Sequence, residues 1–407
     1  MAETSVDEPG HPPLHVGLNL IFLVPGETGG MEIAARELIP ELLAQAAPGI
    51  RFTAFVNREA AAAEGPWREL LPAVTVPVSA SDRKQWVLGE QTLLPPLAAR
   101  AGVDLMHSMA STAPLWGRFR RVVTVHDLIY ARFPDAHAGL RDKGMRVLVP
   151  WAVRRSDRVI ADSQSTRDDL MALLGMERER VDVVPLGLGA VQHADPLSEP
   201  AVRARFELGA RQVVLSLSAK RAHKNLLALI GALARIAPQE RPVLVLPGYA
   251  TAYELELRAR ARALDLDADV RFPPWVSVEE LEGLWSIASA SVFPSLYEGF
   301  GLPVLEAMAR GVPVACSNAS SLPEVAGDAA LLFNPRDETA IATALMQLLG
   351  DRALAARLRE RGLTRAREFT WQRTARLTLD SYARALGRSV SVAPPSAVPL
   401  PTELPVS

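Results

Sequence analysis

The feature that most constrains the fold of this chain is a regular alternation of short apolar runs with longer amphipathic stretches. Each run is as long as a buried strand, and each amphipathic stretch has the 3.6-residue period of a helix. The strand-like runs include residues 15–24, 51–56, 104–108, 120–126, 157–163, 181–185, 212–218, 242–248, 269–275, 290–295, 311–317 and 328–333. Strands that alternate with helices favour parallel sheets with helical crossovers, so we predict a doubly wound α/β fold.

The alternation is interrupted once, between Gly187 and Glu207, where Gly, Pro and Asp are frequent. The chain has 407 residues, which suits two domains of roughly 100–200 residues each. We therefore predict an amino-terminal Rossmann-like domain at 1–190 and a carboxyl-terminal one at 205–370. A helix at 371–388 is expected to return to the first domain, and the Pro-rich tail at 389–407 is expected to be disordered.

Composition excludes several classes of protein. The net charge of −2 gives no basic field for nucleic acid, so no nucleic-acid partner is expected. The single cysteine, Cys316, cannot form an intrachain disulfide, which suits a reducing compartment. The first 13 residues are acidic and Pro-rich, unlike a secretory signal, and no run reaches the ~20 apolar residues of a membrane span. We expect a cytoplasmic protein.

Peripheral attachment at the inner face of the membrane is an open alternative. Arginines between Arg118 and Arg158, together with Trp116 and Trp151, could form a face that meets lipid. An ordinary helix with a solvated basic side explains the same residues.

The most informative segment joins a strand at 291–293 to a helix that begins near Leu302. Gly299 and Gly301 allow close approach of the backbone to a ligand, and Pro303 suits the first helical turn. The free N–H groups of a helix start bind anions such as a diphosphate. Glu298 and Glu306 bracket this start, and carboxylates accept hydrogen bonds from sugar hydroxyls. The pattern predicts a sugar-nucleotide site, although a solvated Glu298 and a helix-stabilising Glu306 would also fit it.

The motif Glu-Gly-Phe-Gly-Leu-Pro-x-x-Glu-Ala at 298–307 resembles the Glu-x7-Glu motif of the retaining GT-B glycosyltransferases of family 4. The resemblance continues through the Leu-Pro-Glu turn at 322–324 and the Asn-Pro turn at 334–335, and it covers nearly the whole chain from Leu14 to about Leu386. It implies a GT-B fold, with two Rossmann-like domains facing a central cleft. It also implies transfer of a hexose from a nucleotide-diphosphate sugar with retention of the α configuration.

The resemblance implies roles for further residues. A lysine just before Asn-Leu contacts the donor diphosphate in this family, and Lys224 has that position. The family often has a second base about five positions earlier, where this chain has Ala219, so either Lys220 or Arg221 is expected to replace it. Backbone groups of Gly301, Leu302 and Val304 would complete the phosphate site, and Glu306 would hold the ribose.

Other strand ends add candidates on both sides of the cleft. Gly29 and Gly30 follow the first strand and resemble the family's Gly-Gly loop, which faces the donor. His126 ends another strand at a position that contacts the donor sugar in the family, and with Glu298 it is our catalytic candidate. Val276 is expected to contact the nucleobase through its backbone. Ser163 follows a strand, where capping the next helix is its expected role.

No metal or other cofactor is expected. The chain has no Asp-x-Asp in a loop after a strand, no zinc spacing of His and Cys, and no P-loop. The expected partners are a GDP- or UDP-linked sugar donor, with mannose favoured, and a glycan, lipid-linked or small-molecule acceptor. A GT-B epimerase or phosphorylase and a non-catalytic sugar-nucleotide-binding subunit stay open as alternatives. A dinucleotide oxidoreductase fits less well, because the first strand is not followed by Gly-x-Gly-x-x-Gly.

Overall fold

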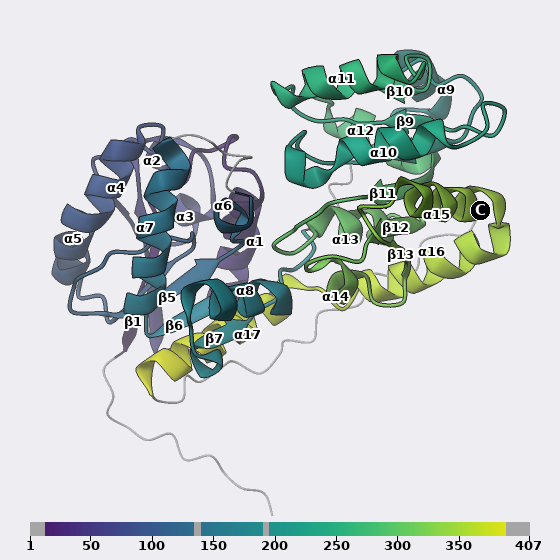
Figure 1. The fold of residues 1–407 in the computed structure, drawn as a ribbon. Coiled ribbons are helices and arrows are strands. Elements are labelled where there is room, and N and C mark those ends of the chain that lie inside the picture. The colour runs from purple at the N-terminus through teal and green to yellow at the C-terminus, as the bar shows by residue number, and fades with distance from the viewer. Residues whose placement is uncertain (1–12, 134–139, 190–194, 388–407) are drawn as a thin grey trace, which may run out of the picture.

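The computed structural model describes residues 13–133, 140–189 and 195–387, which form two α/β lobes (Figure 1). The first lobe contains a parallel seven-stranded sheet in the order β3-β2-β1-β4-β5-β6-β7. Its strands are β1 (Leu14–Leu20), β2 (Ile50–Val56), β3 (Ala73–Thr75), β4 (Leu105–Ser108), β5 (Arg120–Val125), β6 (Arg158–Ala161) and β7 (Val181–Val183).

Helices connect these strands as crossovers. They are α1 (Gly30–Gln45), α2 (Arg58–Ala62), α3 (Pro66–Glu69), α4 (Arg83–Thr92), α5 (Leu94–Ala101), α6 (Ile129–Arg132), α7 (Leu140–Arg155), α8 (Gln164–Leu174) and the 3-10 helix η1 (Arg178–Arg180).

The second lobe contains a parallel six-stranded sheet in the order β10-β9-β8-β11-β12-β13. Its strands are β8 (Val213–Leu215), β9 (Val243–Val245), β10 (Val270–Arg271), β11 (Ala288–Phe293), β12 (Val314–Ser317) and β13 (Ala330–Phe333). Its helices are α9 (Glu199–Arg205), η2 (Ala222–Lys224), α10 (Leu226–Ala234), α11 (Tyr253–Ala263), α12 (Val278–Ile287), α13 (Leu302–Ala309), α14 (Leu322–Ala326), α15 (Glu338–Gly350) and α16 (Arg352–Ala366).

Both sheets reverse their strand order at one point, between β1 and β4 in the first lobe and between β8 and β11 in the second. The reversal sends neighbouring crossover helices to opposite faces, which leaves a crevice at the carboxyl ends of these strands. The loops that follow β1, β5, β8 and β11 therefore gather at ligand-binding edges. These loops contain most of the candidate residues.

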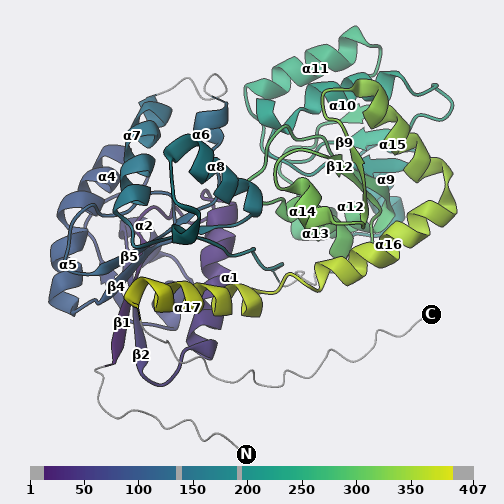
Figure 2. The same ribbon diagram turned by 60° about the horizontal axis from the view of Figure 1, so that its bottom comes forward.

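The last helix, α17 (Trp371–Leu386), follows the second lobe in sequence but packs on the first, against α1, β5 and β6 (Figure 2). The chain thus crosses between the lobes twice. The two crossing segments lie side by side, because Leu188 N donates to Phe369 O at 2.9 Å. Gly187 is required there, since a Cβ at this position would lie 2.3 Å from the backbone nitrogen of Trp371.

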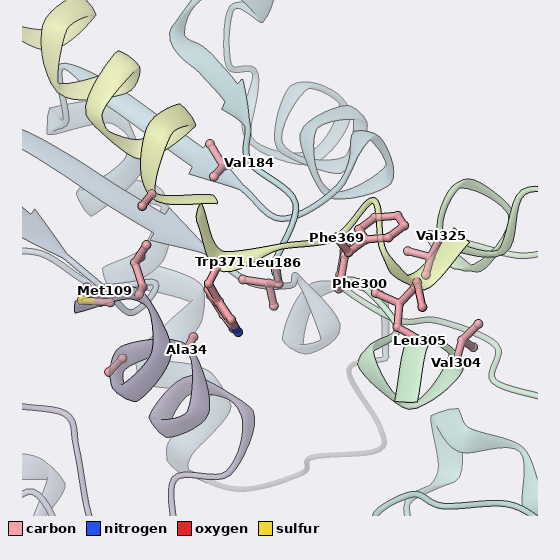
Figure 3. Close-up of a cluster of buried hydrophobic side chains, with 14 of the residues drawn as sticks. Ala34, Met109, Val184, Leu186, Phe300, Val304, Leu305, Val325, Phe369 and Trp371 are labelled. Carbon is pink, nitrogen blue, oxygen red and sulfur yellow. The ribbon is translucent and has the colours of Figure 1, made fainter. Parts of the chain in front are cut away.

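One cluster of buried apolar side chains runs through this crossing and includes residues of both lobes (Figure 3). Leu186 and Trp371 belong to the part in the first lobe. Phe300 and Phe369 meet in the second lobe, with ring centroids 5.8 Å apart in an edge-to-face arrangement. Phe300 immediately precedes Gly301, so the core also fixes the loop that leads into α13.

The segment expected as a linker, from Gly187 to Glu207, contains the short helix α9, which packs on α12 of the second lobe. Its first turn contains Pro200, a residue that breaks helix interiors but suits their starts. The tail at 389–407 lies outside the described residues. Within the described ranges, no helix combines the length and apolar character needed to cross a membrane.

Candidate functional site

The start of α13 has the geometry of an anion site. Gly301 is its N-cap residue and has a φ of 119°, a conformation that strains residues with a side chain. A Cβ on Gly301 would also lie 2.7 Å from the Leu322 side chain. Pro303 has no N–H to leave unpaired, and the Leu302 N–H lies at the positive end of the helix dipole, whereas Val304 N already donates to Gly301 O at 3.0 Å.

Lys224, which ends η2, lies directly beside Glu298. Its ammonium is 2.7 Å from both carboxylate oxygens of Glu298, and Ser295 donates to one of these oxygens at 2.6 Å. Both charged side chains are only 14% exposed. Burial alone would raise the pKa of Glu298, but the Lys224 ammonium and the Ser295 hydroxyl outweigh it and hold the pKa below its usual value.

Glu306 lies just over one turn after Leu302, the first residue of α13, and is partly buried. Burial raises the pKa of its carboxyl, although the Arg310 guanidinium acts in the opposite direction. Arg310 itself pairs with Glu282. Among the described residues, no cation forms a salt bridge with the Glu306 carboxyl, so its oxygens are available to hydroxyl donors.

His126 follows β5 in the first lobe, and both of its ring nitrogens have protein partners. Nδ1 donates to the Asp162 carboxylate at 2.7 Å and Nε2 to Met109 O at 3.1 Å. Burial lowers the pKa of the imidazole, but Asp162 outweighs it and raises the pKa to about 9. His126 is therefore a cation at neutral pH, and it has no lone pair with which to act as a base.

The two lobes meet at Gly299, the residue after Glu298. A Cβ at this position would lie 1.9 Å from the backbone oxygen of His126, so only glycine allows this approach. The Gly299 carbonyl accepts hydrogen bonds from Ser163 at 2.6 Å and from Thr166 at 3.1 Å. Ser163 also caps α8 by accepting from Thr166 N. The pair Lys224–Glu298 and the pair His126–Asp162 thus lie on either side of one contact.

Two more residues of the second lobe contact the first. The Glu324 carboxylate accepts from Gln164 N at 2.9 Å and from Ser165 N at 3.0 Å, so it caps α8 across the lobe boundary. The hydroxyl of Tyr297 accepts from Leu128 N at 3.1 Å. These contacts fix the approach of the α13 loop to the first lobe.

The remaining candidates lie at other loops of the two edges. Gly29, the N-cap of α1, and Gly30, its first residue, are exposed, and an added Cβ at either position meets no atom of the described residues within 4 Å. Gly29 has a φ of 66°, so this loop has an open surface and a conformation that favours glycine. Val276 is partly buried beside the start of α12.

Lys220 was expected to face the donor phosphates, but its side chain lies inside the second lobe. Its side chain is fully buried, donates to Gly248 O at 2.8 Å and pairs with Glu254 at 3.1 Å. Its ammonium is therefore occupied inside the lobe. Arg221 is exposed at the start of η2. Of the two candidates for the second cation, Arg221 is therefore the one whose side chain can reach a ligand.

Several residues of this site have only weak sequence signals. Asp162 and Ser163 follow β6, and the rule that strand ends share an edge places them near His126. Nothing in the pattern around Ser295, Tyr297 or Glu324 indicates which partner each side chain takes. Over the residues that the structure describes, no three His, Cys, Asp or Glu side chains gather as a metal site requires.

Two models of known families match the chain, one on each lobe. The family model described as "Glycosyl transferases group 1" matches residues 200–365, and the one described as "Glycosyltransferase Family 4" matches residues 28–189. The O-antigen chain mannosyltransferase B of Escherichia coli is 30% identical over 267 residues, which is 65% of this chain and 70% of that protein. This chain belongs to the group 1 glycosyl transferases.

Other relatives of this glycosyltransferase are more distant or longer. The serotype-specific mannosyltransferase WbdA of Escherichia coli is 30% identical over 281 residues, 67% of this chain but only 34% of that protein. The O-antigen chain mannosyltransferase RfbU of Salmonella typhimurium is 28% identical over 228 residues, 56% of this chain and 60% of that protein.

Solved structures show that this glycosyltransferase has the GT-B fold. Sucrose-phosphate synthase of Thermosynechococcus elongatus superposes with a TM-score of 0.71 at 21% identity, and the match covers 92% of this chain and 99% of that one. Anabaena HepE, solved in complex with UDP and glucose, gives a TM-score of 0.69 at 21% identity and covers 91% and 99%. The expected fold, two Rossmann-like parallel-sheet domains of GT-B type, is confirmed.

Proposed function

We propose that this glycosyltransferase moves a hexose, and specifically mannose, from a nucleotide-diphosphate sugar to a glycan or lipid-linked acceptor with retention of the α configuration. The observation that carries the proposal is the pair Lys224–Glu298 at the start of α13, in contact with the first lobe through Gly299. The mannosyltransferase relatives support the choice of sugar.

In this proposal the donor lies along the second lobe. Its diphosphate binds Lys224, Arg221 and the backbone of Gly301, Leu302 and Val304, because a helix start and a cation together favour a dianion. The ribose hydroxyls donate to Glu306. The base lies near Val276. A diphosphate that binds Lys224 competes with Glu298 for its ammonium, and this frees Glu298 to accept from hydroxyls of the sugar.

The transfer breaks the bond between C1 of the sugar and the phosphate oxygen, and the electron pair leaves with the diphosphate. Lys224 and the α13 N–H groups stabilise this developing charge without a metal ion. The acceptor oxygen attacks C1 on the face from which the phosphate departs, and its proton passes to a phosphate oxygen. His126, which is protonated, contributes a fixed positive charge rather than a base.

The first lobe provides the acceptor side of the cleft. Gly29 and Gly30 offer an open loop to the sugar, and the lobes exclude water where they meet at Gly299. A cytoplasmic location, with contact to the inner face of a membrane through the Trp116 and Trp151 side chains, would suit a lipid-linked acceptor; these two side chains are 53% and 52% exposed. Polysaccharide assembly is the process that such a reaction serves.

A binding and turnover experiment tests the proposal. The chain is screened by thermal shift against GDP-mannose, UDP-glucose, UDP-N-acetylglucosamine and ADP-glucose, since a bound ligand raises the melting temperature by mass action. GDP-mannose is expected to stabilise the protein most, and NMR of the product is expected to show an α linkage. EDTA is expected to leave the rate unchanged. A protein that binds none of these donors would contradict the proposal.

The open alternatives differ in their products. An epimerase or phosphorylase converts the donor without a glycan acceptor, and a non-catalytic subunit binds the donor without turnover. The variant Glu298→Gln separates them further. In a transferase it keeps the affinity for GDP and lowers the turnover, because Glu298 contacts the sugar and not the nucleotide.

A further inference from the structure

A buried carboxyl group in the first lobe has no part in the transfer chemistry proposed so far. Glu90 lies in α4 and is only 1% exposed. Its Oε1 accepts from Asn19 Nδ2 at 2.9 Å and from Thr112 Oγ1 at 3.1 Å. Its Oε2 accepts from Gln91 Nε2 at 3.3 Å. Among the described residues no cation forms a salt bridge with Glu90, and burial raises its pKa to about 7 in spite of these hydrogen bonds. A buried carboxyl without a cation costs stability and is typical of functional sites.

Glu90 contacts the first sheet at the point where its strand order reverses. Asn19 belongs to β1 and is paired in register with Ser108, the last residue of β4. The Asn19 amide donates to Ser108 Oγ at 3.1 Å as well as to Glu90. The order reverses between β1 and β4, and ligands of such sheets bind in the crevice at this point. The Glu90 carboxyl is therefore linked to both strand ends that border the crevice of the first lobe.

The neighbouring residue Gln91 binds the loop that follows β4, at 109–116. Its Nε2 donates to Ala113 O at 3.1 Å, and its Oε1 accepts from Leu115 N at 2.9 Å. The indole N–H of Trp116 donates to the backbone oxygen of Gln91 at 2.5 Å. The loop is therefore tied to α4 through both side-chain and main-chain atoms.

The first residue of this loop reaches the candidate site. Met109 O accepts from His126 Nε2 at 3.1 Å. Against the effect of burial, this bond adds to the Asp162 carboxylate in raising the pKa of the imidazole. Met109 N donates to Asn19 O at 3.4 Å, while the side chain of Asn19 donates to Glu90. A shift of the loop would move Met109 O away from the imidazole, and the ring would keep only one of its two partners.

We propose that Glu90 and Gln91 are positioning residues for the transfer reaction. They hold the loop at 109–116 in the place where Met109 O fixes the His126 ring. The inference rests on the proposed function only in that it takes the protonated His126 as part of the site. A carboxylate suits position 90 because all three of its partners donate hydrogen bonds. In Glu90→Gln an NH2 group can face the NH2 group of Gln91, and two donors cannot bond to each other.

The test follows the His126 ring by NMR in the full chain. Labelling with 13C at Cε1 gives one signal for each of the seven histidines, and His126→Gln assigns the signal of His126. A pH titration then gives its pKa, which is about 9 in the wild type. Glu90→Gln is expected to lower this pKa by about 1, because the imidazolium loses a hydrogen bond. The variant keeps the size of the side chain, so the fold is expected to be retained.

Activity gives a second measurement. Glu90→Gln is expected to lower kcat for the release of GDP from GDP-mannose about tenfold to a hundredfold, because the charge of His126 is misplaced. Its affinity for GDP in calorimetry should match the wild type, since the nucleotide lies on the second lobe. Its melting temperature should change little, because a buried charge is removed together with the hydrogen bond. Gln91→Met removes the bonds to Ala113 and Leu115 and should show the same pattern.

Asp157→Asn is the matched control in the same lobe. The Asp157 carboxylate accepts from Arg121 N at 2.8 Å and pairs with Arg120, so it also joins two segments of the chain. It lies at the amino ends of β5 and β6, the edge opposite the candidate site. This variant is expected to lower the melting temperature and to leave kcat and the pKa of His126 unchanged.

Three results would overturn the inference while leaving the proposed function intact. The first is an unchanged pKa of His126 in both Glu90→Gln and Gln91→Met. The second is a lower melting temperature of these variants with an unchanged kcat, which would assign the two residues to stability alone. The third is an equal loss of kcat in Asp157→Asn. A wild type that neither binds GDP nor releases it would instead overturn the proposed function, and the NMR titration would still decide whether Glu90 positions the ring.

Discussion

The two ion pairs that meet near Gly299 differ in how completely the protein satisfies them. In the first lobe, His126 has a partner on each ring nitrogen, Asp162 and Met109 O, so its proton is fixed. In the second lobe, Lys224 meets Glu298 through both carboxylate oxygens, and Ser295 adds one hydrogen bond. We propose that both groups of this second pair, the Lys224 ammonium and the Glu298 carboxylate, bind the sugar-nucleotide donor.

This difference separates two kinds of buried charge. The His126–Asp162 pair is part of the structure of the first lobe, and its charge state is set before any ligand arrives. The Lys224–Glu298 pair holds two groups that a sugar nucleotide can take over, the cation by phosphate and the carboxylate by hydroxyls. Substitutions that break the contact between the pairs, and then each pair in turn, test whether one pair is structural and the other binds the donor.

The largest effect is expected from Gly299→Ala, which separates the two pairs. The new Cβ would lie 1.9 Å from His126 O, so the lobes must move apart. Misplacement of about 1 Å can cost a hundredfold in rate, and we expect kcat/KM for the donor to fall by at least about that factor. Gly350→Ala is the control, since its Cβ meets no atom within 4 Å. Equal activity of the two variants would contradict the role of this contact.

The next effect is expected from Lys224→Met, which breaks the second pair. Loss of a charged hydrogen bond to phosphate is worth about 1.5–3 kcal/mol, so GDP affinity should fall roughly tenfold to a hundredfold. Glu298 then keeps the burial that raises its pKa and loses the cation that lowers it. The variant should therefore be destabilised most at pH 7, and its difference in melting temperature from the wild type should shrink towards pH 5. A difference that grows in acid would exclude this explanation.

The His126–Asp162 pair is expected to make the free energy of unfolding depend on pH. The pKa of His126 is about 9 in the folded chain, above its ordinary 6.5. A raised pKa stabilises the fold fully below pH 6.5, and the contribution disappears as the pH rises through 9. We expect the free energy of unfolding to fall by on the order of 3 kcal/mol over this range. Denaturant titrations of the wild type and of His126→Gln check it, and the variant should lack this slope.

The smallest effect is expected from Glu324→Ala, which removes the cap that the second lobe places on α8. Because Glu324 reaches α8 only across the lobe contact, a loss of about 1 kcal/mol there weakens the contact, and kcat/KM should fall about fivefold. The melting temperature should change little, since Ser163 still caps α8. Asp337→Ala is the matched control, because Asp337 caps α15 within the second lobe. It should lower the melting temperature and spare activity. The reverse pattern in the two variants would rule out a role for Glu324 in joining the lobes.

Much of the fold follows from local patterns that tertiary contacts do not override. The alternation of apolar runs and amphipathic stretches indicates two parallel sheets, because buried strands and crossover helices have different periods. The start of α13 at Leu302 follows from Gly301 and Pro303, which suit only a few backbone positions. The strand-like runs also predict that Lys224, Glu298 and His126 lie in loops that follow strands, where ligands bind in this class of fold.

What sequence could not supply was the direction of individual side chains in loops. Lys220 and Lys224 are four residues apart in one loop, yet the first is fully buried against Glu254 and the second contacts Glu298. That choice depends on where the loops after β9 and β11 lie, and these are distant in sequence. The sequence did not predict the two partners of the His126 ring for the same reason, because Met109 and Asp162 follow different strands.

The double crossing at Leu188 and Phe369 has a mechanical consequence. Two covalent connections that touch at one place form a single pivot, and we expect any opening of the lobes to rotate about an axis through it. Atoms near the pivot then move least, and the loop tips farthest from it sweep the widest arc. The amino-terminal lobe also cannot be isolated by cutting the chain before Glu199, because such a fragment would lack α17, which packs on its sheet.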